Sequence, residues 1–451
     1  MNGVRSLTPW TIATLVAGVP VVVGTAVVQP AVLLPVAGLL GLLAATPLLR
    51  RLAEGAAWSL PVLVGVAVLL VDTAGRTLAP GPLRYVATAL VVATILLVGI
   101  RPDQRSSLLR TTGLVLFAYG FVGTVYGRLV FDTENGTLPL VGPLVIACLP
   151  PVRNWTARQD WRLGLRVLAA VCALFAVCSG LARMGVLPET HIEVLNHEKA
   201  FLVVLGIAAA VSARDRLLVL ATVGAAVFAF IQYPAATYPL AVAVALGTFV
   251  LVRCAPRPGL RVLLAGGVMV TATLAVAYID DLIRLTASYF RLVGKTNNGS
   301  TRAALYRAAL DSFDSPVFGS LFTGDITVVG TLSGENQVVP VHNDYLSIAL
   351  GGGVVAAAML LGLFLLANGM VLRSLPDLVD PMQRRTAVIL LAAVNAAAVS
   401  AFANPIFMNP GASAVTYALL AALMAVCRTG TPVQPVRRSP VSAAPDRRLP
   451  I

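Results

Sequence analysis

Long apolar stretches, each about as long as a membrane-spanning helix, follow one another along nearly the whole chain. A helix needs roughly 20 apolar residues to cross the hydrocarbon core of a bilayer. The predicted spans are residues 10–28, 31–49, 57–71, 83–100, 111–131, 137–152, 163–185, 200–211, 216–233, 237–252, 261–279, 345–372, 386–403 and 411–427. This pattern predicts an all-α, polytopic transmembrane bundle of about 14 spans, within a range of roughly 12 to 14.

The spacing of the spans predicts four regions. Transmembrane helices 1–11 occupy residues 1–279, and a large extracytoplasmic loop with a short amphipathic helix occupies residues 280–343. Helices 12–14 follow in residues 344–427, and residues 428–451 form a disordered basic tail. We expect the first apolar stretch to be retained as a span, because it is longer than the apolar part of a cleaved signal peptide and a second stretch follows almost directly.

Composition supports a membrane protein. The chain is 58% hydrophobic and only 12% charged, which leaves too little polar surface to cover a soluble protein of 451 residues. The net charge of +13 comes from basic residues spread through short loops, which is unlike a nucleic-acid interface. Basic loops mark the cytoplasmic side of membrane proteins. The distribution therefore predicts that both termini are cytoplasmic and that the large loop lies outside.

The predicted spans hold almost no ionisable residues away from their ends. Coupled transporters usually keep carboxylates or histidines at mid-membrane, because the coupling charge must reside there. Their absence argues against coupled transport, and it directs attention to the outer face, where polar residues gather.

The large loop is cationic. Residues 298–301 predict a turn and helix start, and Pro316 ends the helix that continues through about Phe313. Arg302 begins an apolar stripe of this helix, which comprises Tyr306, Leu310 and Phe313 at i, i+4 and i+7. A cation in the first helical turn is unfavourable unless an anion binds there, and amides and a guanidinium together suit a phosphate. The alternative is an interfacial arginine that reaches lipid phosphates.

Histidines give two further candidate sites. His342 stands at the membrane boundary next to Asn343 and Asp344, where a neutral imidazole could act as a general base; the alternative is an ordinary interfacial histidine. His191 and His197 lie among glutamates in residues 188–198, but their spacing matches no metal-ligand pattern, so a solvated loop is the preferred interpretation. We therefore predict no metal site.

Two short motifs resemble those of the O-antigen ligase and polymerase superfamily, whose members are polytopic bacterial glycosyltransferases. One is the arginine-led helix 300–310, followed by Pro316-Val-Phe-Gly319. The other is His342-Asn343-Asp344-Tyr345-Leu346, which runs into a span with Gly351-Gly352-Gly353. The resemblance covers residues 298–356 in detail. It departs from the family in residues 232–238, where relatives often carry a Ser-Arg pair and this chain has no arginine.

The resemblance implies transfer of a glycan from an undecaprenyl-diphosphate carrier to an acceptor hydroxyl at the outer face of the bacterial plasma membrane. Arg302 would bind the diphosphate and His342 would deprotonate or orient the acceptor, without metal or cofactor and with inversion of the anomeric carbon. The expected substrate-binding residues are Arg291, Lys295, Arg307, Asn343, Asp344 and Tyr345. Tyr345 is alternatively an interfacial anchor.

The expected partners are the lipid-linked glycan, an acceptor glycan or lipid, membrane lipids and proteins of polysaccharide assembly, but no nucleic acid. The sequence does not separate a ligase from a polymerase or from ligation to a protein or wall polymer, because these differ in the acceptor. A transporter of a lipid-linked sugar or polysaccharide is the alternative from another class, and a structural partner of an assembly complex is a third.

Overall fold

The fold is helical, with one small β-hairpin. The computed structural model describes parts of residues 52–69 and the ranges 108–131, 160–185, 199–254, 299–323, 327–332 and 335–428, apart from residues 236, 314 and 403. Its elements are η1 (Ala57–Ser59), α5 (Leu108–Phe131), α7 (Trp161–Arg183), α8 (Ala200–Ala213), α9 (Arg216–Gln232), α10 (Thr237–Cys254), α13 (Gly299–Asp311), β1 (Thr327–Leu332), β2 (Glu335–Pro340), α14 (Asp344–Ser374), η4 (Leu375–Asp377), α15 (Pro381–Ser400) and α16 (Pro410–Arg428). The helical fold class is thus confirmed for the described residues.

Four described helices are long and apolar enough to cross a membrane, at residues 108–131, 161–181, 237–254 and 344–377. Three shorter apolar helices accompany them, at residues 200–213, 216–232 and 411–427. Each of these segments coincides with a predicted span, and α15 coincides with one more. The predicted spans at 10–28, 31–49, 83–100, 137–152 and 261–279, and the tail 429–451, lie outside the described residues, and the span at 57–71 lies partly outside them.

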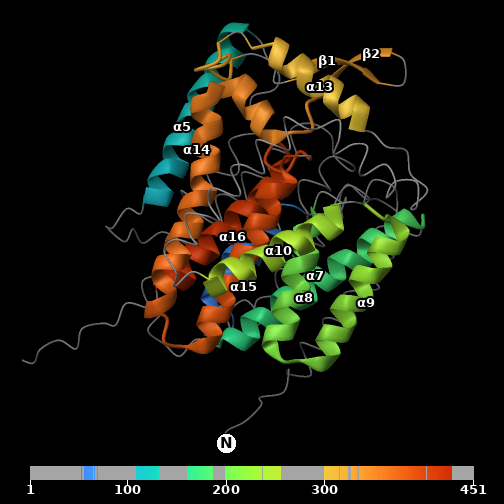
Figure 1. Cartoon of the computed structure of the whole chain (residues 1–451), viewed down its shortest axis with the longest axis vertical. Helices are drawn as coiled ribbons and strands as arrows, with labels where there is room; N and C mark the ends of the chain where they lie inside the picture. The colour runs from blue at the N-terminus through green and yellow to red at the C-terminus, as the bar shows by residue number, and fades with distance from the viewer. Residues whose placement is uncertain are drawn as a thin grey trace, which may run out of the picture.

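Helices α15 and α16 form the centre of the bundle (Figure 1). Both are buried on almost every side, which is expected of helices that are apolar all round. At the periphery, large apolar side chains are exposed, including Leu129 on α5 and Leu217 on α9, each 80% exposed. Exposed apolar faces of this extent mark contact with lipid or with another protein, and together with the long apolar helices they suggest a membrane protein.

α14 is interrupted at Gly353, whose φ of 68° and ψ of −173° are not helical. Only glycine adopts this conformation without strain. The break leaves backbone groups of α14 without partners inside the helix, and residues 316–322 supply them. The Ser320 and Phe322 amides donate to the carbonyls of Leu350 and Gly351 (3.0 and 2.7 Å), and the Val354 amide donates to the carbonyl of Pro316 (2.9 Å).

Glycines permit this close approach. A Cβ atom at Gly353 would lie 2.0 Å from the Val317 carbonyl oxygen, and one at Gly319 would lie 2.4 Å from the Leu350 oxygen. The two glycine motifs that the sequence singles out, 316–319 and 351–353, therefore form one joint. We call it the glycine joint. It fixes the segment after α13 against the first turns of α14.

The β1–β2 hairpin was not predicted. Its strands pair antiparallel, from Thr327 opposite Pro340 to Leu332 opposite Glu335. The hairpin and α13 lie together at one end of the bundle, beside the start of α14 (Figure 1). All three belong to the predicted loop region 280–343 or its boundary, and α14 begins at Asp344 as predicted.

Candidate functional site

The two residues predicted to carry the chemistry, Arg302 and His342, come together where α13 meets the start of α14. Arg302 lies in the first turn of α13, and His342 lies between β2 and α14. The positive charge of Arg302 acts on the imidazole of His342. The fold thus brings Arg302 close enough for its charge to act on His342, although the two residues stand far apart in the sequence.

α13 is held in place by a small apolar cluster. Leu305 and Ala309 are buried against Val328, Val341 and Leu350. Arg302 lies one helical turn before Leu305, at the start of this buried face.

Leu310 does not belong to the buried face of α13, contrary to the predicted stripe, because its side chain is 53% exposed. The neighbouring Ala309 is fully buried instead. A small side chain at the contact lets the helix lie close to its neighbours, so the buried face is turned by one residue from the predicted one.

His342 has a left-handed backbone, with φ of 56°. Histidine adopts this region more readily than most residues, but it remains uncommon. Both neighbours, Val341 and Asn343, are buried, and they hold the backbone in this conformation. Such conformations cluster at functional sites, where the surrounding fold keeps a side chain in a required position.

The pKa of His342 is lowered from 6.5, first by burial and then by the positive charge of Arg302. Both effects disfavour the charged imidazolium. His342 is therefore neutral at neutral pH, with a free lone pair on the ring. Its side chain is only partly buried, so the ring can meet a bound molecule.

Tyr306 links α13 to the connection between α15 and α16, residues 401–409, which we call the α15–α16 connection. Its hydroxyl donates to the Phe402 carbonyl at 3.0 Å. Burial raises the pKa of Tyr306, while the charge of Arg302 and a hydrogen bond from Asn343 act in the opposite direction. Tyr306 thus stays protonated and positions the helix that carries Arg302.

The three residues after His342 have intramolecular roles. The Asn343 side chain caps α14, accepting from the amides of Tyr345 (3.1 Å) and Leu346 (3.2 Å). The Tyr345 hydroxyl donates to the Ala398 carbonyl at 3.0 Å. Its ring stacks on Phe402 with the centroids 4.3 Å apart.

Asp344 is fully buried and anchors the start of α14. Its carboxylate accepts from the backbone amides of Phe407 and Met408, and its own amide donates to the Ala401 carbonyl at 2.9 Å. Together with Asn343 and Tyr345, it fixes the backbone that presents His342. A direct contact of these three side chains with substrate stays a prediction.

The other charged residues and histidines that the sequence singles out lie on the exposed side of α13 or outside the described residues. Arg307 lies on the exposed side of α13. Arg291, Lys295, His191 and His197 lie outside the described residues. Within the described ranges, no three His, Cys, Asp or Glu residues are placed to hold a metal ion.

The α15–α16 connection is the part of the site that the sequence reasoning missed. It contacts Tyr306, Asp344 and Tyr345. The adjoining Ser400 is fully buried, and its hydroxyl has no hydrogen-bond partner among the residues that the structure describes. The Asn-Pro pairs at 404–405 and 409–410 are turn signals that mark the segment in the sequence, but nothing local points to its partners.

A second arginine lies at the stretch 232–238, which has none of its own. The guanidinium of Arg183, at the end of α7, lies 4.1 Å above the ring of Tyr233, at the end of α9. This is a cation–π contact, and it places a positive charge beside the stretch 232–238.

No protein-family model matches the chain, and no curated protein is significantly similar to it.

Proposed function

We propose that the protein is a membrane glycosyltransferase of the O-antigen ligase and polymerase type, which acts in cell-surface polysaccharide biosynthesis. It transfers or polymerises glycan from an undecaprenyl-diphosphate carrier onto an acceptor hydroxyl at the outer face of the bacterial plasma membrane. The observation that carries this proposal is the meeting of Arg302 with a neutral, positioned His342. Such a pair can neutralise an anionic leaving group and accept a proton in one step.

The proposed reaction is a single displacement at the anomeric carbon. The acceptor hydroxyl gives its proton to His342 as the acceptor oxygen forms a bond to that carbon. The bond between the carbon and the diphosphate breaks, and undecaprenyl diphosphate leaves with its electron pair. Arg302 stabilises the charge that develops on the diphosphate. Attack from the side opposite the leaving group inverts the anomeric carbon.

Arg183 supplies a second contact to the carrier diphosphate in this proposal. Its guanidinium lies 4.1 Å above the ring of Tyr233, next to the stretch in which the family resemblance implies an arginine. A guanidinium stacked on an aromatic ring is held in one orientation while its outer edge stays available to an anion. Arg291, Lys295 and Arg307 stay candidates for weaker contacts.

The proposed topology has about 14 spans with both termini cytoplasmic. Contacts between helix ends support this topology. Each contact connects two helix ends that the sequence assigns to the same side of the membrane. On the inner side, Arg166 pairs with Asp215 at 3.2 Å. Also on that side, Gln383 donates to the Val426 carbonyl at 2.8 Å.

A transporter of a lipid-linked sugar or polysaccharide is the alternative, and it needs a polar route through the bundle. The amide of Asn395, in the middle of α15, donates to Thr248 at 3.1 Å and Asn368 at 3.0 Å. Asn368 donates back to Asn395 at 2.8 Å. These side chains bind one another across three helices, which favours helix association over a polar path.

The test is the glycan profile of the host lacking this gene, complemented with wild type, His342→Ala, Arg302→Ala or Asp311→Asn. Asp311 is an exposed residue at the end of α13 and serves as the matched control. Membrane insertion is checked for each variant. Wild type and Asp311→Asn should restore long or surface-attached glycan, and the other two should not.

The material that accumulates distinguishes the subtypes. Single repeat units on the carrier indicate a polymerase, and long glycan retained on the carrier indicates a ligase. If His342→Ala and Arg302→Ala both restore the glycan, the site is structural, and transport or a scaffolding role in an assembly complex takes precedence.

A further inference from the structure

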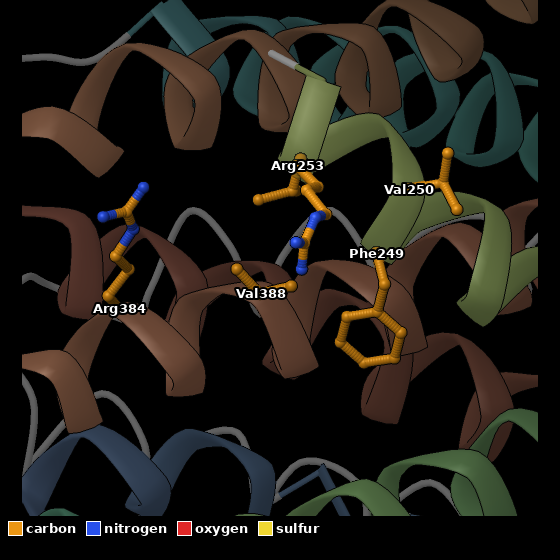
Figure 2. A pocket seen from close by; sticks show the side chains of 6 residues that line it. Phe249, Val250, Arg253, Arg384 and Val388 are labelled. Carbon is orange, nitrogen blue, oxygen red and sulfur yellow. The ribbon is translucent and has the colours of Figure 1, made fainter. Parts of the chain in front are cut away.

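A second cationic site lies at the opposite end of the bundle from α13. A pocket with a volume of about 460 Å³ opens between the end of α10 and the start of α15. It is lined by Phe249, Val250, Val252, Arg253, Arg384 and Val388. Figure 2 shows the two arginine side chains entering this space from different helices, with Val388 between them.

Neither arginine is neutralised by an acidic side chain in the part of the chain that the structure describes. Within the described ranges, no acidic side chain forms an ion pair with Arg253 or Arg384, and both side chains are exposed. Two guanidinium groups that share a pocket repel each other, and an anion between them turns this repulsion into attraction. Arginine is suited to phosphate, because its planar fork can form paired hydrogen bonds with phosphate oxygens.

The apolar half of the site lies on α10. Leu246, Phe249, Val250 and Arg253 stand at i, i+3, i+4 and i+7, which places them along one helix face. Leu246 is 60% exposed and Val250 is 56% exposed. One face of α10 therefore combines an exposed apolar strip with a cation at its end.

We propose that this pocket binds an anionic phospholipid of the surrounding bilayer. The headgroup phosphate lies between Arg253 and Arg384, and an acyl chain lies along Leu246, Phe249 and Val250. A free phosphate ion would satisfy the arginines but would leave the apolar strip unused. In the proposed topology the pocket faces the cytoplasmic leaflet, where basic pockets between spanning helices bind lipid headgroups.

The test is native mass spectrometry of the purified full chain, titrated with phosphatidylglycerol or with phosphatidylcholine of the same acyl chains. Wild type should bind phosphatidylglycerol in preference to phosphatidylcholine. The affinity of the double variant Arg253→Gln/Arg384→Gln for phosphatidylglycerol should be lower than that of wild type by a factor of about ten or more. Arg385→Gln is the matched control, because Arg385 is the exposed neighbour of Arg384 on α15 but does not line the pocket.

Unchanged binding of phosphatidylglycerol by a monodisperse double variant, or an equal loss in Arg385→Gln, would overturn the proposal. If the double variant is not monodisperse, the single variants Arg253→Gln and Arg384→Gln are compared with Arg385→Gln in the same way. Inorganic phosphate is added to wild type as a competitor at the concentration of the lipid. Displacement of phosphatidylglycerol by phosphate at that concentration would show that the site takes the ion and not the lipid.

Discussion

The carboxylate of Asp344 accepts a hydrogen bond from the backbone amide of Phe407, which lies 63 residues further along the chain. This contact ties the first turn of α14 to the α15–α16 connection. Since His342 lies two residues before Asp344, the same contact determines where the imidazole stands relative to the bundle. The site therefore depends on a long-range anchor that does not itself touch the imidazole.

Asp344→Asn should lower the free energy of unfolding by about 2 kcal/mol, because a hydrogen bond to a charged acceptor is lost in a buried place. The side-chain NH₂ group of asparagine would also face backbone N–H groups, from which it cannot accept a hydrogen bond. Thermal unfolding of the purified protein in detergent measures the change. Asp311→Asn on the exposed end of α13 is the control and should leave the midpoint unchanged. Equal midpoints for both variants would contradict the anchoring role.

Gly353→Ala should prevent accumulation of folded protein. The substitution adds a Cβ atom 2.0 Å from the Val317 carbonyl oxygen, at a backbone conformation that costs about 1–3 kcal/mol for a residue with a side chain. Gly362→Ala in the same helix is the matched control. Its Cβ would meet no atom within 4 Å, so it should be neutral or stabilising by up to about 1 kcal/mol. The yield of monodisperse protein distinguishes the two, and a stable Gly353→Ala would show that the glycine joint is dispensable.

The pKa of His342 should govern the acid side of the activity profile. Because this pKa lies below 6.5, the imidazole stays neutral into mildly acidic conditions. Activity should therefore fall only when the pH drops below 6.5. Arg302→Gln removes a positive charge, so the pKa should rise towards 6.5 while burial still holds it lower. The chain has only three histidines, so NMR of selectively labelled imidazoles can follow each one, with His342→Asn assigning the signal. If Arg302→Gln leaves the pKa of His342 unchanged, the charge of Arg302 does not act on the imidazole.

Arg183→Ala should reduce glycan transfer by about 10- to 100-fold if its guanidinium contacts the carrier diphosphate, since one charged hydrogen bond is worth about 1.5–3 kcal/mol. Arg183→Lys should recover part of the loss, because lysine keeps the charge but not the stacked fork. Arg166→Ala, which breaks the ion pair with Asp215 on the inner side, is the control. Full activity of Arg183→Ala would remove Arg183 from the proposed site.

The local features of the site could be predicted from the sequence. The helix that carries Arg302 begins at Gly299, within the predicted turn, and ends at Asp311, shortly before Pro316. His342 lies directly before α14, as its place ahead of a long apolar run indicated. These features depend on turn residues and on hydrophobic length, which are properties of short segments.

The features that could not be predicted from the sequence depend on contacts between distant segments. Nothing near Asp344 in the sequence points to Phe407, and the pairing of Gly319 with Gly353 appears only when α14 is broken. The β1–β2 hairpin had a local signal, because two β-branched runs flank the Ser-Gly pair at 333–334. It was missed because it lies inside a loop between helices. Hydrophobicity predicts Leu310 on the buried face, because the sequence alone does not show that the close contact favours Ala309.

The most direct test of the glycosyltransferase account is bond formation by the reconstituted protein. Full-length protein in proteoliposomes is given the undecaprenyl-diphosphate-linked glycan that accumulates in the deletion strain, together with a membrane extract of that strain as the source of acceptor. Wild type and Asp311→Asn should release undecaprenyl diphosphate and form a new glycosidic bond, while His342→Ala should lower the rate by about 10²–10⁴ and Arg302→Ala should also fail. Equal rates for inserted His342→Ala, Arg302→Ala and wild type would contradict the account.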